Sequence, residues 1–238
     1  MARAILRQRA TLTEHFCKAE LVAPRLRIGV TELAAVTWVP SFVGQLRMHY
    51  PKILLELEVG SSPQLFEAVR TGRLSVAMVI DVKRTVEMAR IPVGTARMGW
   101  YCAAGLLTSA SLTLNELEKQ TLLLQGPSTG AGRLLSDWLA GQSIIPANVI
   151  QSDSLSALSG IAAAGLGIAH LPRAVASDGL QSGRLQEVQI PVDSPNLNYV
   201  AIARIDTVSA FHRAVIKLAQ ESCDFDTPFH ARPIPKTI

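Results

Sequence analysis

The chain has 238 residues, of which 48% are hydrophobic and 18% charged, and its formal net charge is +4. A composition this apolar can bury a sizeable core, which excludes a mainly disordered chain, and the length allows one large domain or two small ones. The sequence contains no run of about 18 apolar residues and no apolar segment of a secretory signal near its N-terminus, so we expect a cytoplasmic protein with no membrane partner.

The positive charge is confined to the start of the chain. Residues 1–27 carry six basic and two acidic residues, and this excess of four positive charges equals the net charge of the whole chain. The other residues contain equal numbers of basic and acidic side chains. The globular body therefore lacks the basic surface that a nucleic-acid-binding domain needs.

The first part of the chain predicts a helix and then an alternation of strands and helices. Residues 1–22 have amphipathic helical spacing that ends at Pro24. From Arg25 onward, strands are predicted at 25–31, 53–59 and 75–80, and helices at 39–50 and 63–71. The 53–59 strand alternates strictly and should expose Glu56 and Glu58 on one face, whereas 75–80 is continuously apolar, as in a buried central strand. This order is typical of a parallel sheet with helical crossovers.

The same rhythm returns in the second part of the chain. Strands are predicted at 91–96, 98–105, 121–125, 148–152, 167–171, 185–190 and 199–204, and helices at 114–119, 131–140, 155–164 and 209–222. Two α/β units of this kind predict two lobes with a cleft between them, followed by a loose, proline-containing tail.

The motifs of common enzymes are missing from the sequence. It has no G-x-S-x-G elbow, no H-E-x-x-H and no Cys/His cluster with zinc spacing, and the run at 126–133 lacks the G-K-[ST] ending of a phosphate loop. The three cysteines are far apart and are expected to be reduced thiols. We therefore expect no catalytic residue, no metal and no cofactor.

Hydroxyl side chains stand at three junctions where a predicted strand leads into a helix. These junctions are Thr31, Ser128-Thr129-Gly130 and Ser152-Asp153-Ser154. The first turn of a helix offers N–H groups and partial positive charge to a carboxylate, sulfate or phosphate, and ligands of α/β sheets bind at the carboxyl ends of strands. The same residue types also serve simply as helix N-caps, so each junction is either a ligand contact or a cap.

The order of these segments resembles the effector-binding domain of LysR-type transcriptional regulators. The most specific segment is 152–176, in which a helix ends in A-A-G-L-G-I-A-H-L-P, and residues 182–191 match the segment that follows it. Residues 26–80 resemble the opening of the family's first lobe, including the break at Tyr50-Pro51. The resemblance covers about residues 3–223.

This resemblance implies an α/β fold with two Rossmann-like lobes and a cleft, similar to periplasmic solute-binding proteins, with two crossover strands joining the lobes. It places a partial linker helix at 1–24, lobe I at 25–97 plus 198–225, lobe II at 98–197 and a loose tail at 226–238. The family's DNA-binding winged helix-turn-helix is absent from these residues, so DNA would be reached only through a domain outside them. A homodimer or tetramer is implied, with the 53–59 strand and its neighbouring helices as candidate dimer surface.

The resemblance also implies an effector site in the cleft for a small molecule, expected to be a carboxylate or another anion. Thr31 falls where the family places a hydroxyl, and Leu33 falls where some members have a second one. The other candidate positions are Ser128, Thr129, Ser152 and Asp153. Trp100, at the first crossover, either lines the cleft or is buried in the hinge.

Two other functions remain open at this point. A transport-type solute-binding protein would have the same two lobes, although the sequence shows no export signal. An enzyme with its active site in the cleft would need paired carboxylates or a nucleophile with a base, and no such set is recognisable.

Overall fold

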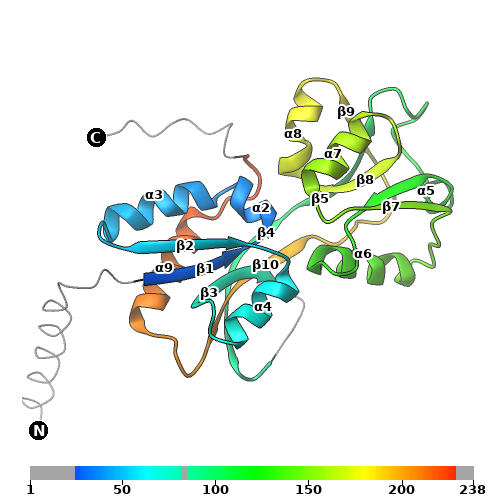
Figure 1. Cartoon of the computed structure of the whole chain (residues 1–238). Coiled ribbons are helices and arrows are strands. Elements are labelled where there is room, and N and C mark those ends of the chain that lie inside the picture. The colour runs from blue at the N-terminus through cyan, green and yellow to red at the C-terminus, as the bar shows by residue number, and fades with distance from the viewer. Residues whose placement is uncertain (1–24, 82–84, 229–238) are drawn as a thin grey trace, which may run out of the picture.

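The computed structural model describes residues 25–81 and 85–228, so the helix predicted at the start of the chain and most of the predicted tail lie outside the described residues. Within them, the chain forms two five-stranded sheets, each with helices on both faces (Figure 1). The prediction of an α/β fold with two lobes is confirmed. In the part of the chain that the structure describes, no helix is long and apolar enough to span a membrane.

We use lobe I for the sheet of order β2-β1-β3-β10-β4 and the helices packed on it. Strand β1 pairs in parallel with β2 and β3, whereas β10 runs antiparallel to β3 and β4. The elements of lobe I are β1 (Arg25–Val30), α2 (Glu32–Val36), α3 (Val39–His49), β2 (Leu54–Val59), α4 (Ser62–Arg70), β3 (Val76–Ile80), β4 (Met88–Ala96), β10 (Leu197–Arg204) and α9 (Ala210–Ser222).

We use lobe II for the sheet of order β7-β6-β8-β5-β9 and its helices. Strand β6 pairs in parallel with β7 and β8, and β5 runs antiparallel to β8 and β9. The elements of lobe II are β5 (Met98–Ala103), α5 (Leu114–Glu118), β6 (Thr121–Leu124), α6 (Gly130–Gly141), β7 (Asn148–Gln151), α7 (Leu155–Ala163), β8 (Ile168–Pro172), α8 (Arg173–Gln181) and β9 (Leu185–Val188).

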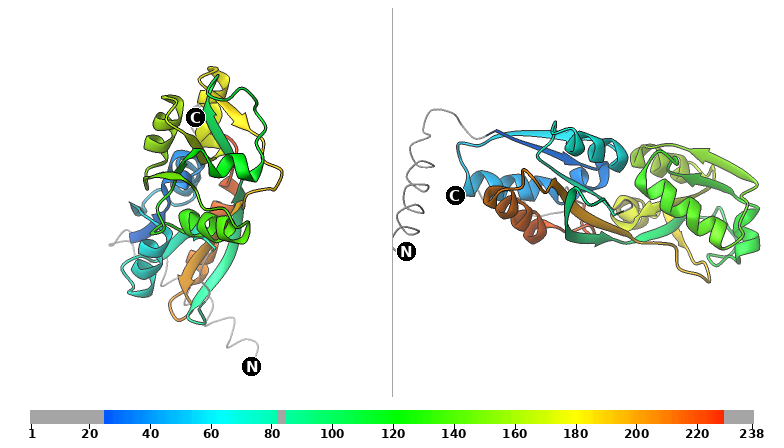
Figure 2. Two further views of the ribbon diagram at one scale, coloured as in Figure 1. Left: turned by 90° about the vertical axis from the view of Figure 1, so that its right-hand side faces the viewer. Right: turned by 90° about the horizontal axis from the view of Figure 1, so that it is seen from below.

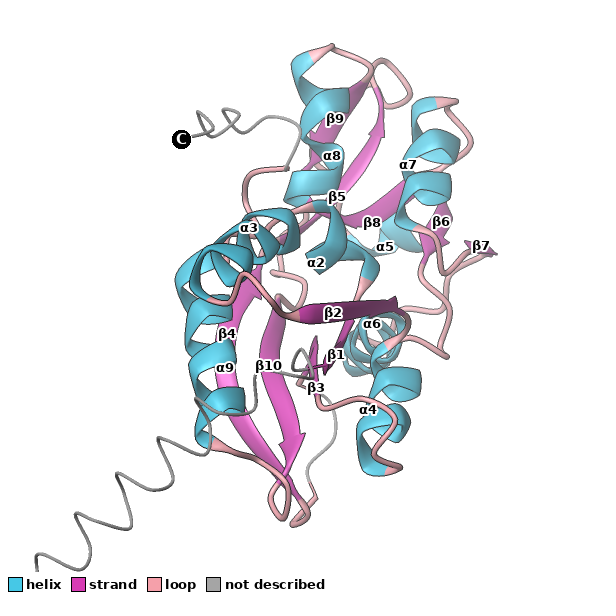
Figure 3. Ribbon diagram, turned by 60° about the vertical axis from the view of Figure 1, so that its left-hand side comes forward, coloured by secondary structure: helices cyan, strands magenta, loops and turns pink. Residues whose placement is uncertain are grey.

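Helices cover both faces of each sheet, which explains the continuously apolar central strands. In lobe I, α3 and α9 pack together on one face and α4 on the other (Figure 3). In lobe II, successive residues of β6 alternate between the two faces: Leu123 joins the core under α7 and α8, whereas Leu122 and Leu124 pack under α5 and α6. All five residues of β3 are buried because neither face of this strand meets solvent.

The chain passes between the lobes twice. Strand β4 of lobe I continues through Arg97 into β5 of lobe II, and the segment after β9 returns to lobe I as β10 (Figure 2). The two passages are tied together, because the Met98 N–H donates to Asn196 Oδ1 at 3.1 Å and the Thr95 hydroxyl donates to Asn198 Oδ1 at 2.9 Å. A paired hinge of this kind fixes how the lobes face each other.

Two helices were not expected from the sequence. Helix α2 has five residues, which is too short to show helical periodicity. Helix α8 buries only Ala174, Ala176 and Gly179, and residues this small do not give the apolar stripe by which a helix is recognised.

The expectation for the strand at 53–59 holds only in part. As predicted, Glu56 and Glu58 reach solvent, where they pair with Arg27 and Arg73. However, Leu57 and Val59 on the opposite face are also exposed, because β2 is the edge strand of the sheet.

Candidate functional site: the cavity between the lobes

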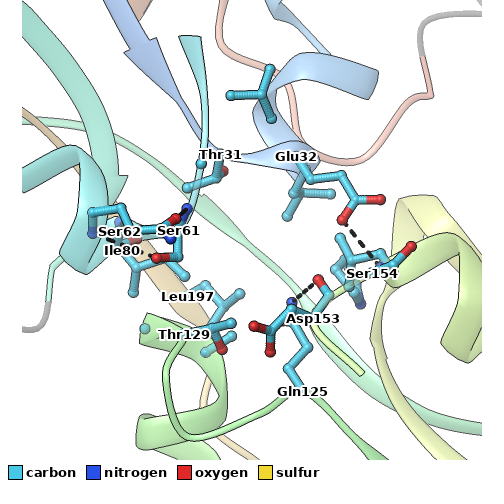
Figure 4. Close-up of a pocket in the computed structure, with 18 of the residues that line it drawn as sticks. Thr31, Glu32, Ser61, Ser62, Ile80, Gln125, Thr129, Asp153, Ser154 and Leu197 are labelled. Carbon is cyan, nitrogen blue, oxygen red and sulfur yellow. Dashed lines mark hydrogen bonds between the residues drawn. The ribbon is translucent and has the colours of Figure 1, made fainter. Parts of the chain in front are cut away.

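A cavity of about 390 Å³ lies between the two lobes, which is within the usual size range of small-molecule sites (Figure 4). Both lobes line it at the edge where their parallel strands end, as expected for α/β sheets. Lobe I contributes Thr31, Glu32, Leu33, Val59, Gly60, Ser61, Ser62, Gln64, Ile80, Leu197 and Tyr199. Lobe II contributes Gln125, Thr129, Gly130, Ala131, Asp153, Ser154, Leu155 and Pro172.

Three helices of nine residues or more, α4, α6 and α7, begin at this cavity. Their N-caps are Ser61, Thr129 and Ser154, and each hydroxyl accepts from the backbone N–H three residues further on, at 3.5, 2.9 and 3.3 Å respectively. The first-turn N–H groups of a helix lack intrahelical acceptors and carry partial positive charge. Three such ends therefore supply donors to the space between the lobes.

The loop before α6 is held by its own hydrogen bonds. The Thr129 hydroxyl accepts from the Gly132 N–H and donates to the Gly126 carbonyl, both at 2.9 Å, so its donor is committed within the loop. Gly132 is required here because a Cβ at this position would lie 2.1 Å from the Gly126 carbonyl oxygen. The glycines of this segment let α6 start directly against the end of β6, and its first two residues, Gly130 and Ala131, line the cavity.

Asp153 fastens the same loop from the neighbouring strand end. Its Oδ1 accepts from the Gly126 N–H at 3.2 Å and its Oδ2 from the Ser128 hydroxyl at 3.0 Å. Ser128 itself does not line the cavity, and neither does Ser152, whose hydroxyl accepts from the Ser154 N–H at 3.2 Å. Both serines thus position the cavity wall without reaching its interior.

Thr31 and Tyr199 form a buried hydroxyl pair on the lobe I side. Their oxygens are 2.9 Å apart, and the two residues are 8% and 2% exposed. Burial raises the pKa of Tyr199 well above its usual range, an effect only partly offset by the hydrogen bond to Thr31, so the phenol keeps its proton. Whichever hydroxyl donates the hydrogen bond within the pair, the other hydroxyl keeps its own hydrogen. That hydrogen can be donated to an acceptor in the cavity.

Glu32 crosses the cavity from one lobe to the other. Its Oε2 accepts from the backbone N–H of Leu155, the first residue of α7, at 3.1 Å. A carboxylate is stabilised at this place by the partial positive charge of the helix N-terminus. The chain thereby joins the two lobes with a carboxylate of its own.

Among the described lining residues, Glu32 and Asp153 are the charged ones, and no Lys, Arg or His accompanies them. Figure 4 shows both carboxylates on one side of the cavity and Ser61 and Ser62 on the opposite side. The cavity thus has a carboxylate end and a serine end. Its remaining wall contains apolar side chains, namely those of Leu33, Val59, Ile80, Leu155, Pro172 and Leu197.

Four of the seven residues singled out in the sequence therefore line one cavity: Thr31, Leu33, Thr129 and Asp153. Trp100 does not, because its position on β5 directs the indole into the lobe II core, where it is 3% exposed and its ring lies 4.7 Å from that of His170. Of the two places considered for Trp100, the structure shows the buried one.

Several lining residues were missed. Ser61-Ser62-Pro63 follows a strand and opens a helix, the same signal that pointed to the other junctions, and could have been found from the sequence. Tyr199 and Glu32 gave no such signal. Tyr199 reaches the cavity because β10 returns from lobe II into the lobe I sheet, and the reach of Glu32 to α7 depends on how the two lobes pack.

The described residues contain no group of three or more His, Cys, Asp or Glu side chains that could hold a metal ion. The cavity also lacks a nucleophile next to a base: the one described buried histidine, His170, bonds Ser194 at 2.9 Å in the lobe II hinge. The arrangement is that of a binding cavity with hydrogen-bond donors and two carboxylates.

A two-lobed α/β domain with hinge strands and an interlobe cavity defines a ligand-binding domain of the periplasmic-binding-protein type. The sequence model of the LysR substrate binding domain matches residues 19–224. The chain belongs to this family, which is one of transcription regulators and not of enzymes. The resemblance seen in the sequence is confirmed.

Relatives and solved structures agree with this assignment. The chain is 26% identical over 187 residues to the HTH-type transcriptional regulator GltR of Bacillus subtilis, covering 77% of this chain and 61% of GltR. It is 26% identical over 163 residues to CbbR of Rhodospirillum rubrum, covering 68% and 54%. The chain thus spans little more than half the length of these regulators.

The fold is shared with LysR regulatory domains of known structure. The regulatory domain of MetR from N. meningitidis superimposes with a TM-score of 0.68 at 22% identity, covering 84% of this chain and 93% of that one. The effector binding domain of QuiR, in complex with shikimate, gives a TM-score of 0.73 at 14% identity, covering 84% and 97%. The CcmR regulatory domain of Synechocystis, in complex with 2-PG, gives 0.72 at 14%, covering 83% and 96%.

Proposed function

We propose that this chain is the effector-sensing and dimerising domain of a cytoplasmic LysR-type regulator, and that its effector is a small carboxylate or similar anion held between the lobes. The observation that carries the proposal is that α4, α6 and α7, from both lobes, begin at one cavity. The QuiR and CcmR regulatory domains named above were solved in complex with shikimate and 2-PG, which supports a small-molecule effector here.

The effector contacts follow from the donors that the cavity offers. Gly130 and Ala131 present the first N–H groups of α6, and the Thr31–Tyr199 pair has one hydroxyl hydrogen to give. An anion held by these groups would bridge the lobes. It would favour one relation between them, because a ligand shifts an equilibrium only by its differential affinity for the two states.

We assign lobe I to residues 25–97 plus 198–225 and lobe II to 98–197, as the resemblance implies, with the one difference that β10 already begins at Leu197 in lobe I. DNA would be contacted by a winged helix-turn-helix outside these residues, in a homodimer or tetramer. The exposed edge strand β2, with Leu54, Leu57 and Val59 at its surface, is the candidate dimer contact. Effector binding would change how the DNA-binding domains are held.

Thermal unfolding of the purified chain against small carboxylates, phosphates and sulfate tests the proposal. A compound present at 100 times its Kd stabilises the folded state by about 2.7 kcal/mol, which raises Tm by roughly 5–10 °C for a chain of this size. We expect a selective increase with at least one carboxylate. No increase with any anion would contradict the proposal.

A matched pair of variants locates the binding. Val59 lines the cavity, whereas Leu166 lies outside both the cavity and the edge strand β2, and both side chains are more than half exposed. Val59→Trp should narrow the cavity mouth and weaken the binding of the effective anion at least tenfold, with Leu166→Trp as control. Equal weakening by both variants would indicate that the anion binds elsewhere.

A further inference from the structure

The charged side chains that line the cavity are both negative, which favours a ligand that carries a positive charge besides its carboxylate. Glu32 and Asp153 both line it, and no cationic side chain among the described lining residues neutralises them. Their hydrogen-bond partners are backbone N–H groups and a serine hydroxyl, which donate hydrogen bonds without adding a full positive charge. These charges weaken the hold of the helix N-termini on a simple anion, and a positive group on the ligand would offset them.

Both carboxylates also keep unused acceptor capacity. A carboxylate has about four lone-pair positions. Glu32 uses one of them for the Leu155 N–H, and Asp153 uses two for Gly126 and Ser128. A ligand with several N–H donors and a positive charge satisfies what remains, and an ammonium group has three such donors.

The other end of the cavity offers donors. Ser61 and Ser62 lie there at the start of α4, opposite the two carboxylates in Figure 4. The start of α6 lies beside them, because a Cβ on Gly130 would be 3.3 Å from the Ser62 hydroxyl oxygen. The Thr31–Tyr199 pair, more than nine-tenths buried, adds a hydroxyl hydrogen that the pair itself does not use. The same cavity thus pairs acceptors at one end with donors at the other.

We propose that the ligand of this cavity is a zwitterion of the amino-acid class, with its ammonium group between Glu32 and Asp153 and its carboxylate on the donors of α4, α6 and the hydroxyl pair. This inference rests on the proposed function and narrows its ligand class. The apolar wall formed by Leu33, Ile80 and Leu197 would receive the side chain of such a ligand.

Binding at the carboxylate end has a consequence for the contact between the lobes. The Glu32 carboxylate spans the cavity to the first N–H of α7. An ammonium group beside it would bring a positive charge to this contact and bind the lobe I carboxylate and the lobe II carboxylate together. The ligand would therefore strengthen an interlobe tie that the chain already makes.

The test uses the intact chain and three matched probe sets: the standard L-α-amino acids, the 2-hydroxy acids with the same side chains, and the amines that lack the carboxylate. We expect at least one amino acid to raise Tm and to bind, by isothermal titration calorimetry, at least tenfold more tightly than its hydroxy acid and its amine. The hydroxy acid keeps the carboxylate, so it isolates the contribution of the ammonium group.

Variants assign that preference to the two carboxylates. Glu32→Gln and Asp153→Asn keep oxygen acceptors for the existing backbone N–H donors and remove the charge. Each should weaken the binding of the amino acid roughly tenfold to hundredfold, the usual weight of a charge-assisted hydrogen bond, whereas the hydroxy acid should bind equally well or more tightly because a repelling charge is removed. Asp137→Asn, on the exposed side of α6 outside the cavity, is the control and should retain the preference.

Three results would contradict the proposal of an amino-acid ligand. The hydroxy acid could bind as tightly as the amino acid, or the preference for the amino acid could persist in the Glu32→Gln/Asp153→Asn double variant. The third result is that no amino acid raises Tm. In the last case, a Tm increase with simple carboxylates would leave the proposed function standing. If no anion and no amino acid raises Tm, both proposals are wrong.

Discussion

The two lobes reach the cavity with the same kind of junction, a strand end followed by a capped helix, but they hold these junctions in different ways. In lobe II, the turn before α6 is fastened locally, through Thr129 to Gly126 and Gly132 and through Asp153 to Gly126. In lobe I, the cap contact of Thr31 is long, 3.5 Å to the Ala34 N–H. Its shorter hydrogen bond goes to Tyr199, 168 residues away in the chain.

This difference shows which part of the site is held within one lobe and which depends on a strand that returns from the other. The lobe II turn is held by contacts within residues 126–132 and by Asp153, at the end of the neighbouring strand. The lobe I wall is complete only when β10 has returned from lobe II and inserted beside β3. Substitutions should therefore act on lobe II through local backbone geometry and on lobe I through distant partners.

We expect the largest effect from a substitution that disrupts the turn before α6 in lobe II. In Gly132→Ala, the added Cβ would lie 2.1 Å from the Gly126 carbonyl oxygen and 2.6 Å from that of Gln125, and backbone atoms cannot turn away as a side chain can. We expect a loss of about 3 kcal/mol or more in the free energy of unfolding, measured by denaturant titration.

Gly141→Ala is the matched control for this loss. It lies at the other end of the same helix, where no atom comes within 4 Å of an added Cβ, and should be neutral or stabilise by up to about 1 kcal/mol. Equal stability of the two variants would show that the turn before α6 is not constrained as described.

The second expected effect is the acid sensitivity of lobe II. Burial of His170 lowers its pKa to about 3, far below the usual value near 6.5. Between these values the unfolded chain binds a proton that the folded chain does not, so stability falls as the pH falls from about 6.5 toward 3. This group should contribute a slope of about 1.4 kcal/mol per pH unit over that window.

Denaturant titrations at several pH values, for the natural chain and for His170→Asn, measure this slope. The variant keeps a polar group for Ser194 and loses the titrating ring, so its stability should depend less on pH by that amount. Identical slopes in the two proteins would mean that His170 takes up its proton in the folded state.

We expect the smallest effect from substitutions at the Thr31–Tyr199 hydroxyl pair of lobe I. Thr31→Val removes the partner of a buried phenol and should cost about 1–2 kcal/mol in the free energy of unfolding. Tyr199→Phe in the same chain removes the unsatisfied hydroxyl and should recover part of that loss. A double-mutant cycle measures the coupling between the two residues, and purely additive losses would exclude the hydroxyl pair as a stabilising contact.

The sequence predicts most of the fold because its central strands and main helices carry clear periodicity. The buried run at β3 and the stripe of α3 were recognised, whereas α8 was missed because its buried residues are small. Three of the four capped junctions at the cavity, those at Thr31, Thr129 and Ser154, were also recognised by their hydroxyls. The fourth, at Ser61, carries the same signal and was overlooked.

What the sequence could not provide is the contact between distant segments. The hydroxyls of Thr129 and Ser128 looked like ligand contacts, yet their donors serve the loop itself. Conversely, Glu32 stands in a short helix without periodicity, and its role follows from the packing of lobe I on lobe II. Local signals find junctions, but only the assembled lobes show which groups face the cavity.

Hydrogen–deuterium exchange with and without the compound that raises Tm most would test the central claim directly, that one small ligand binds both lobes at this cavity. We predict slower exchange, on binding, at the starts of α4, α6 and α7 together with residues 31–34, so that protection appears in both lobes. Protection confined to one lobe, or to segments that do not border the cavity, would contradict the account.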